Sequence, residues 1–143
     1  LTNYCGSWIK PCGWYPDVKL RLFPKEGSRW EGEFVHEVLT VPPHLPVVHL
    51  KGDLLHYSYY TEQEHLERAD KYARLGADKL MAEGKKASWL KGITSAIGRF
   101  FRIYFLRKGF RDGKAGWKIA TISAKAALWK YQYMNAPSTE DDD

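Results

Sequence analysis

This 143-residue sequence lacks any apolar run of the roughly 18 residues that a helix needs to cross a bilayer. It also has little cysteine, only Cys5 and Cys12. Two thiols at this spacing, without a second pair, match no familiar zinc pattern and cannot build a disulfide framework. We expect both to be reduced and structural; a disulfide between them is the alternative. The sequence therefore predicts neither a membrane-spanning helix nor a disulfide-stapled fold.

Acidic side chains are almost missing from residues 85–130, which hold 12 Lys and Arg against the single acid Asp112 and so carry a net charge of +11. Residues 1–84 sum to −2 and residues 131–143 to −4, so the overall charge of +5 hides a sharp segregation. Such a basic block predicts an anionic partner, which could be lipid headgroups, nucleic acid or a phosphorylated substrate.

The same basic block carries aromatic residues at helical spacing, and several interpretations are open. Its helices could simply bury their rings against the first half of the chain. A helix with Trp and Phe on one face and Lys and Arg on the other also suits the plane of a membrane interface, where each cation near an anionic surface adds about 1 kcal/mol. Nucleic acid could use the same charge by stacking bases on the rings. Because the rings follow a helical core pattern rather than an exposed sheet, the external partner we expect is an anionic membrane surface bound by residues 85–130, and no nucleic acid.

The first half of the chain has the pattern of short strands and turns. Apolar and basic residues alternate over 18–22, which is typical of a strand with one buried face. Prolines at positions 42, 43 and 46 interrupt the later segments, because proline cannot donate a ladder hydrogen bond. The other strands that we expect lie at 30–35, 38–41, 47–50 and 54–57.

The pattern changes to helix at residue 61. Thr61 and Glu64 form a capping box, which marks the start of a helix over 61–83. We expect two further helices, at 88–107 and 117–133, separated by a glycine-rich loop at 109–116. In the first helix, the apolar residues at helical spacing are Leu66, Ala69, Ala73, Ala77 and Leu80.

Together these elements predict an α/β fold in which short, mixed β-strands precede about three α-helices. We divide the chain into a β-rich part at 1–60, a basic helical extension close to a membrane at 61–134, and a disordered acidic tail at 135–143. The chain opens on Leu1 rather than Met, in the middle of a pattern. We interpret it as the C-terminal part of a larger enzyme.

Glu37 and His56 are the residues whose chemistry is most informative. Glu37 follows a predicted strand, where a carboxylate can accept a proton from an incoming hydroxyl; a positioned base accelerates such a step by about 10²–10⁴. A solvated surface glutamate is the alternative. His56 could bind a metal through a neutral imidazole nitrogen, or it could be a hydrogen-bonded core histidine.

A turn at 13–17 combines rings with a carboxylate. Asp17 could bind sugar hydroxyls while Trp14 or Tyr15 covers an apolar sugar face. The alternative is a Pro-Asp turn with two core aromatics. Lys51 could meet a phosphate or simply face water.

Several short motifs follow one another along the chain. They are Gly13-Trp14-Tyr15-Pro16-Asp17, Lys19-Leu20-Arg21-Leu22-Phe23, Arg29-Trp30 with Gly32, Val35-His36-Glu37, Leu50-Lys51-Gly52-Asp53-Leu54-Leu55-His56-Tyr57-Ser58-Tyr59, Glu64-His65-Leu66, Tyr72-Ala73, Gly109-Phe110 and Asp112-Gly113. In this order and spacing they resemble the latter half of the family-2 glycosyltransferases, and most closely the bacterial enzymes of lipopolysaccharide core biosynthesis. The resemblance covers most of residues 4–131.

The resemblance implies a GT-A fold and an inverting transfer of a sugar, of hexosyl or heptosyl type, from a nucleotide-diphosphate donor to a lipid-linked saccharide of the cell envelope. It implies a cytoplasmic enzyme peripheral to the inner membrane. Family members also carry an N-terminal nucleotide-binding region with an Asp-x-Asp metal motif, which this chain lacks, so we expect the chain alone to be inactive. The alternative is a non-catalytic basic module that binds a membrane surface or nucleic acid.

The resemblance also implies roles for individual residues. Glu37 would be the base, and His56 would be a ligand of a divalent metal, Mg²⁺ or Mn²⁺. The 13–17 turn would form part of the cleft for donor and acceptor. The residues that we assign to substrate binding are Trp14, Asp17, His36 and Lys51.

Overall fold

The structure of the chain is a computed structural model, which describes residues 1–32 and 38–135. It contains two compact units. The first, which we call the helical unit, combines Leu1–Pro16 with Leu55–Asp143, and the second, which we call the hairpin unit, is Asp17–Leu54. Each is described by itself.

A small mixed sheet opens the helical unit. Its strands are β1 (Thr2–Tyr4), β2 (Ser7–Ile9) and β5 (His56–Tyr59), in the order β2-β1-β5. The central strand β1 is antiparallel to β2 and parallel to β5. The turn from β1 to β2 has positive φ at Cys5 and Gly6, as the tightest hairpins require, and the Asn3 side chain accepts a hydrogen bond from the Gly6 N–H at 3.0 Å. The sequence pattern did not predict β1 or β2, and β5 lies two residues beyond the strand expected at 54–57.

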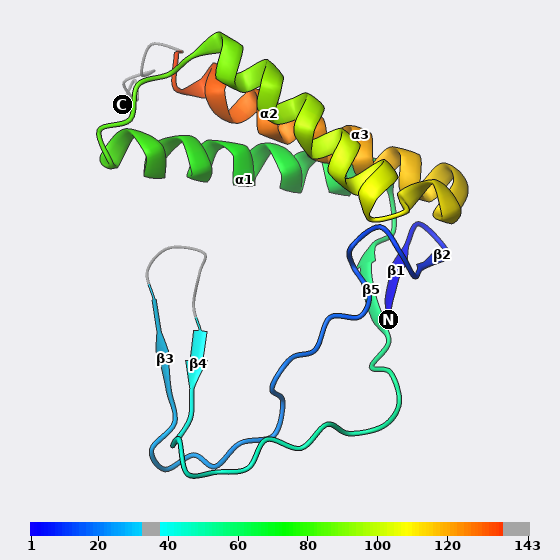
Figure 1. Cartoon of the computed structure of the whole chain (residues 1–143), viewed down its shortest axis with the longest axis vertical. Helices are drawn as coiled ribbons and strands as arrows, with labels where there is room; N and C mark the ends of the chain where they lie inside the picture. Colours follow the sequence, from blue (N-terminus) through cyan, green and yellow to red (C-terminus); the bar gives the residue numbers. More distant parts are fainter. Residues whose placement is uncertain (33–37, 136–143) are drawn as a thin grey trace. The chain divides into compact units, whose positions relative to one another are not determined.

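Three long helices follow the sheet (Figure 1). They are α1 (Glu62–Ala82), α2 (Trp89–Phe101) and α3 (Gly113–Tyr133). A π-helical turn, η1 (Arg102–Leu106), extends α2, and a 3₁₀ turn, η2 (Gly109–Asp112), leads into α3. The start of α1 agrees with the prediction, because Thr61 Oγ1 accepts a hydrogen bond from the Glu64 N–H at 3.1 Å. The predicted α/β class, with a few short strands before three helices, is confirmed.

Helix α3 packs against both α1 and α2, and successive helices run in opposite directions (Figure 1). One core cluster joins the sheet to the helices. Its buried members are Tyr4, Ile9, Cys12, Ile103, Ala115, Ile119 and Ala120. The sheet therefore docks on the end of the helical layer where η1, η2 and the start of α3 meet.

Two details of the helices differ from the prediction. The buried stripe of α1 begins at His65 and continues through Ala69, Ala73 and Ala77, so that Leu66 is only partly buried. The loop expected at 109–116 was wrong, because this segment is η2 and the first turn of α3. Its glycines allow two main-chain segments to approach closely, as at Gly116, where an added Cβ would lie 1.9 Å from the Gly109 carbonyl oxygen.

The hairpin unit contains an antiparallel pair of strands, β3 (Arg29–Glu31) and β4 (Val38–Thr40), with Arg29 opposite Thr40. Strands expected at 18–22 and 47–50 were wrong, because neither segment is a strand in the structure. An alternating pattern predicts a strand only where one face finds a surface to cover it, and Leu22 and Val47 are exposed.

Both cysteines are free, with Cys5 exposed and Cys12 buried, as expected. Burial raises the pKa of Cys12 to about 12, so its thiol stays protonated. Over residues 1–32 and 38–135, no helix combines the length and the apolar composition that crossing a bilayer requires.

Candidate functional site

His56 begins β5 and has an exposed side chain. Its backbone N–H donates a hydrogen bond to the Leu1 carbonyl oxygen at 3.0 Å, which fixes the start of the strand against β1. The Ser58 Oγ lies 3.0 Å from the imidazole Nδ1. If Nδ1 carries the hydrogen and donates a hydrogen bond to the Ser58 Oγ, then Nε2 keeps a lone pair that is free to bind a metal. Metal-binding histidines are usually oriented by a hydrogen bond of this kind from the other ring nitrogen. The alternative of a core histidine does not fit an exposed side chain.

Trp14 belongs to a cluster of rings at the C-terminal ends of β1 and β5, beside the start of α1. Its ring centroid lies 5.9 Å from that of Tyr4, 6.0 Å from that of Tyr59 and 6.1 Å from that of His65. Most of these contacts are edge-to-face, the favourable geometry for aromatic pairs. The half-buried indole therefore has a structural role in this cluster, and its assignment to sugar binding stays a prediction.

His65 is a buried polar residue to which the sequence analysis assigned no role. It shares a hydrogen bond of 3.2 Å between its Nδ1 and the Tyr4 hydroxyl. Burial, with the nearby Arg68 cation, lowers the pKa of His65 to about 4, and burial raises the pKa of Tyr4. Both groups are therefore neutral near pH 7 and satisfy each other's hydrogen bond. Its four-residue spacing from Ala69 and Ala73 was the signal that could have predicted its burial.

Two predicted substrate-binding residues lie in the hairpin unit. Asp17 forms an ion pair with Lys19 at 3.1 Å, with both side chains well exposed. Lys51 is also exposed. Surface pairs of this kind contribute little to stability, so both side chains are accessible to a ligand at low cost. His56 and Trp14 belong to the helical unit, so these four residues are divided between the two units.

Glu37 and His36 lie outside the described residues. In the sequence they immediately precede Val38, the first residue of β4. Their assignments as base and as substrate-binding residue stay predictions.

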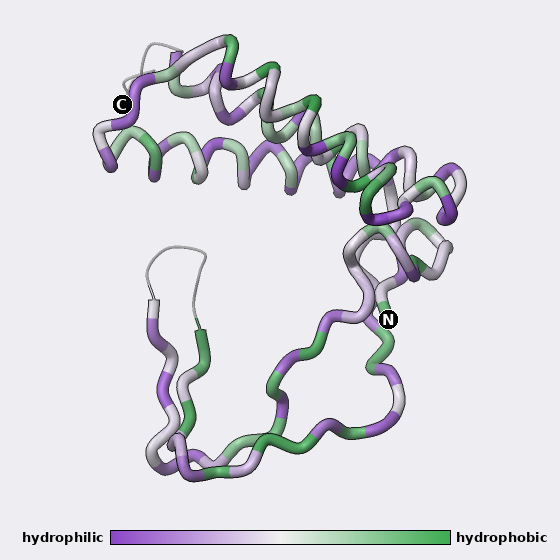
Figure 2. The backbone as a smooth tube through the Cα atoms, in the orientation of Figure 1, coloured by the Kyte–Doolittle hydropathy of each residue, from purple (hydrophilic) through white to green (hydrophobic). Residues whose placement is uncertain are grey.

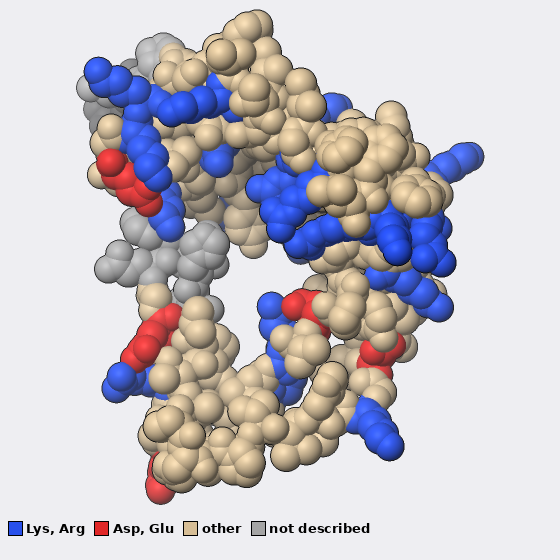
Figure 3. Space-filling view, viewed as in Figure 1, with Lys and Arg blue, Asp and Glu red and all other residues tan. Residues whose placement is uncertain are grey.

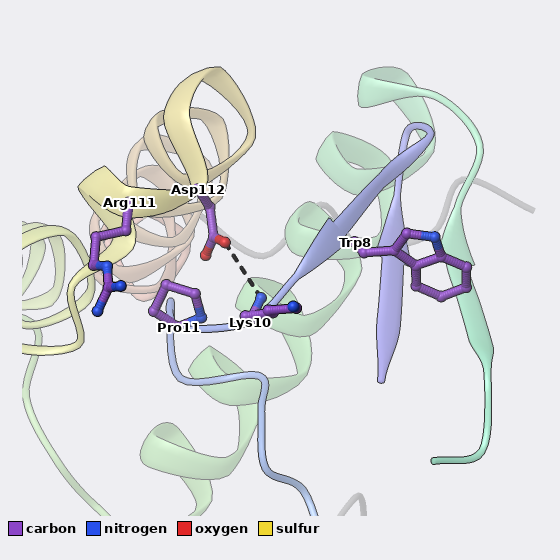
Figure 4. A pocket seen from close by; sticks show the side chains of 5 residues that line it. All are labelled: Trp8, Lys10, Pro11, Arg111 and Asp112. Atoms are coloured by element: carbon purple, nitrogen blue, oxygen red, sulfur yellow. Dashed lines mark hydrogen bonds between the residues drawn. The ribbon is translucent and has the colours of Figure 1, made fainter. Parts of the chain in front are cut away.

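An open depression of about 520 Å³ in the helical unit was not predicted (Figure 4). Trp8 of β2, Lys10 and Pro11 line it from one side, and Arg111 and Asp112 of η2 line it from the other. One carboxylate oxygen of Asp112 accepts a hydrogen bond from the Lys10 N–H at 3.2 Å, and burial raises the pKa of this carboxyl. Asp112 therefore ties the end of β2 to the start of α3, a structural role that suffices to explain it.

The described residues do not assemble a complete metal site. Outside 33–37 and 136–143, no group of three His, Cys, Asp or Glu side chains is placed to hold a metal ion. His56 is exposed and could supply one ligand.

No protein-family model matches the chain, and no solved structure matches it.

Proposed function

We propose that the chain is the acceptor-side part of an inverting glycosyltransferase with a GT-A fold, which moves a sugar from a nucleotide-diphosphate donor to a lipid-linked saccharide. The observation that carries this proposal is the order and spacing of the motifs between Gly13 and Gly113. Each motif is weak alone, and their common order is what resembles the lipopolysaccharide core enzymes. The role of the chain would be to present the acceptor hydroxyl and its base.

The exposure of apolar side chains in the hairpin unit supports the idea of a larger protein. None of its described residues is buried. An isolated two-stranded hairpin is marginally stable in water, and exposed apolar side chains on this scale need a cover. A donor-binding region of the kind that the resemblance implies would supply one. The exposed apolar residues are Val18, Leu20, Leu22, Phe23, Trp30, Val38, Val47, Val48, Leu50 and Leu54.

Glu37 would act as the general base. Its carboxylate would take the proton of the acceptor hydroxyl while the hydroxyl oxygen forms a bond to the anomeric carbon of the donor sugar. The bond from that carbon to the diphosphate oxygen breaks at the same time, and the nucleoside diphosphate leaves with the electron pair. Attack from the face opposite the leaving group inverts the anomeric configuration.

The remaining residues would position the substrates. Asp17 carries acceptor oxygens suited to sugar hydroxyls, and the exposed Lys51 suits a phosphate as a point charge. When bound, a divalent metal would neutralise charge on the leaving diphosphate. His56 is the described residue that we assign to it.

The direct test of this proposal is the stereochemistry of transfer. The enzyme that carries this chain, incubated with nucleotide-diphosphate sugars and lipid-linked saccharide, is expected to give a product with the anomeric configuration opposite to that of the donor. Proton NMR of the product measures this through the coupling constant at the anomeric carbon. A retained configuration, or no transfer from any donor of this class, would contradict the proposal.

His56→Ala is expected to weaken Mn²⁺ binding by at least about 10–100-fold, the usual cost of losing even a residue that only orients a metal ligand. Isothermal titration calorimetry of the same enzyme measures the affinity. His49→Ala is the matched control, because His49 is also exposed and belongs to the other unit. Equal Mn²⁺ affinity of wild type and His56→Ala would make His56 a structural residue of β5.

A further inference from the structure

The outer face of α2 and η1 carries a row of exposed apolar side chains, which we call the α2 stripe: Leu90, Ile97, Phe101 and Phe105. Each of these side chains is between 49% and 66% exposed. The rings of Phe101 and Phe105 lie 5.1 Å apart, so the stripe continues across the junction of the α-helix with the π-helical turn. Figure 2 shows hydrophobic positions recurring along this helix. An apolar row of this length on a surface helix indicates a binding face.

The inner face of α2 explains why the stripe points outward. Gly92 is buried against α3, where an added Cβ would lie 3.1 Å from the Cβ of Tyr131 and 3.3 Å from a methyl carbon of Leu128. Further along, the Phe100 ring packs edge-on against Trp117 of α3 at 5.3 Å. Of the stripe, Phe105 also contacts the inner rings of Phe100 and Tyr104, at 6.5 and 5.2 Å. None of the four stripe residues belongs to the core cluster of the helical unit.

Cations are exposed on the same two elements as the stripe, Lys91 and Arg99 on α2 and Arg102 on η1. In the ranges 1–32 and 38–135, Lys85 and Lys118 are the cations of the 85–130 block that form ion pairs. Figure 3 shows Lys and Arg side chains gathered over the helical unit, with few acids among them. Positive charge that the described residues leave unpaired favours a negative partner.

We propose that the α2 stripe inserts into the interfacial layer of an anionic phospholipid bilayer, with α2 lying in the plane of the membrane. The apolar side chains would enter the boundary between headgroups and acyl chains while the long cationic side chains of α2 and η1 reach lipid phosphates. Trp89, exposed in the first turn of the helix, is the residue type that prefers this layer. This proposal does not rest on the transferase activity, since none of the residues assigned to the transfer belongs to α2 or η1.

Other partners fit the same surface less well. A second copy of the chain would bring two basic blocks of like charge together, which costs energy. Nucleic acid could pair with the cations, but Leu90 and Ile97 present no ring on which a base could stack. Only an anionic lipid surface uses both the aliphatic side chains and the charge.

Co-sedimentation of the full chain with vesicles tests the proposal, because it needs neither donor nor acceptor sugar. Binding to vesicles of phosphatidylcholine mixed with phosphatidylserine is expected to exceed binding to pure phosphatidylcholine and to fall as salt rises. The double variant Ile97→Ser with Phe101→Ser is expected to bind at least about tenfold more weakly. Lys91→Gln with Arg99→Gln is expected to lose about fivefold for each charge removed.

Matched controls come from α1, where Tyr72, Met81 and Lys71 are also exposed. Tyr72→Ser with Met81→Ser, and Lys71→Gln alone, are expected to bind vesicles like wild type. Circular dichroism verifies that every variant keeps its helices. Unchanged binding of the Ile97/Phe101 variant, or equal losses in the α1 controls, would overturn the proposal. So would a duplex-DNA gel shift that depends on Lys91 and Arg99 while no vesicle binding is found.

Discussion

Glu37→Gln is expected to lower the rate of sugar transfer by about 10²–10⁴ in the enzyme that carries this chain, with donor affinity unchanged. Glutamine has nearly the same shape as glutamate but cannot accept a proton. The acceptor hydroxyl would therefore attack as a neutral group, while the contacts that hold the donor stay in place. Initial rates at saturating donor and acceptor measure kcat, and calorimetric titration measures the donor Kd.

Glu31→Gln is the matched control, because Glu31 belongs to the same hairpin unit and its own hydrogen bonds are described. Its carboxylate accepts hydrogen bonds from the Thr40 hydroxyl, at 2.9 Å, and from the Arg29 guanidinium. These bonds hold the pKa of Glu31 below its usual value, which makes it a poor base. Transfer by Glu31→Gln is expected to match wild type. Wild-type turnover by Glu37→Gln would remove Glu37 from the mechanism.

Gly116→Ala is expected to destabilise the helical unit by about 3 kcal/mol or more. The new Cβ would lie 1.9 Å from the Gly109 carbonyl oxygen, which is main chain and cannot turn aside as a flexible side chain would. The first turn of α3 must then separate from η2. That movement also disturbs Cys12, whose thiol lies 4.0 Å from the Gly116 carbonyl oxygen. Urea denaturation measures the loss, and the melting temperature is expected to fall by about 10 °C.

Gly98→Ala is the opposite case in a neighbouring helix. An added Cβ at this position of α2 meets no atom within 4 Å. Alanine lowers the entropy cost of forming a helix, so this variant is expected to gain about 0.5–1 kcal/mol. If Gly116→Ala melted at or above the temperature of Gly98→Ala, the close approach of η2 and α3 would be disproved.

Local signals in the sequence were enough to predict that three long helices exist and where α1 and α2 begin, but not where α3 begins. Thr61 and Glu64 mark the start of α1, and the apolar spacing that follows them needs no information from distant residues. Ser88 plays the same capping role for α2, where its hydroxyl accepts a hydrogen bond from the Lys91 N–H at 3.4 Å. Each signal lies within one helical turn, so a sequence window contains it.

Features that depend on distant contacts were not predictable in this way. By local rules the glycines of 109–116 predict a loop. Nothing in the nearby sequence reveals that the main chain at Gly109 lies against Gly116 in the first turn of α3. Strand β1 has only three residues and depends on β5, which is more than fifty positions away in the sequence. In the candidate site, the sequence shows that a histidine stands at position 56, whereas the exposure of its side chain and its contact with Ser58 depend on the fold. Glu37 depends on the sequence resemblance alone.

The central place of α3 has a consequence for how the protein is made on the ribosome. Helices α1 and α2 each pack on α3, and α3 is synthesised after both of them. Until residue 133 has left the exit tunnel, Ala73 and Ala77 of α1 and the rings of α2 have no cover. Until α3 emerges, the nascent chain therefore exposes apolar surface, the situation in which growing chains rely on chaperones.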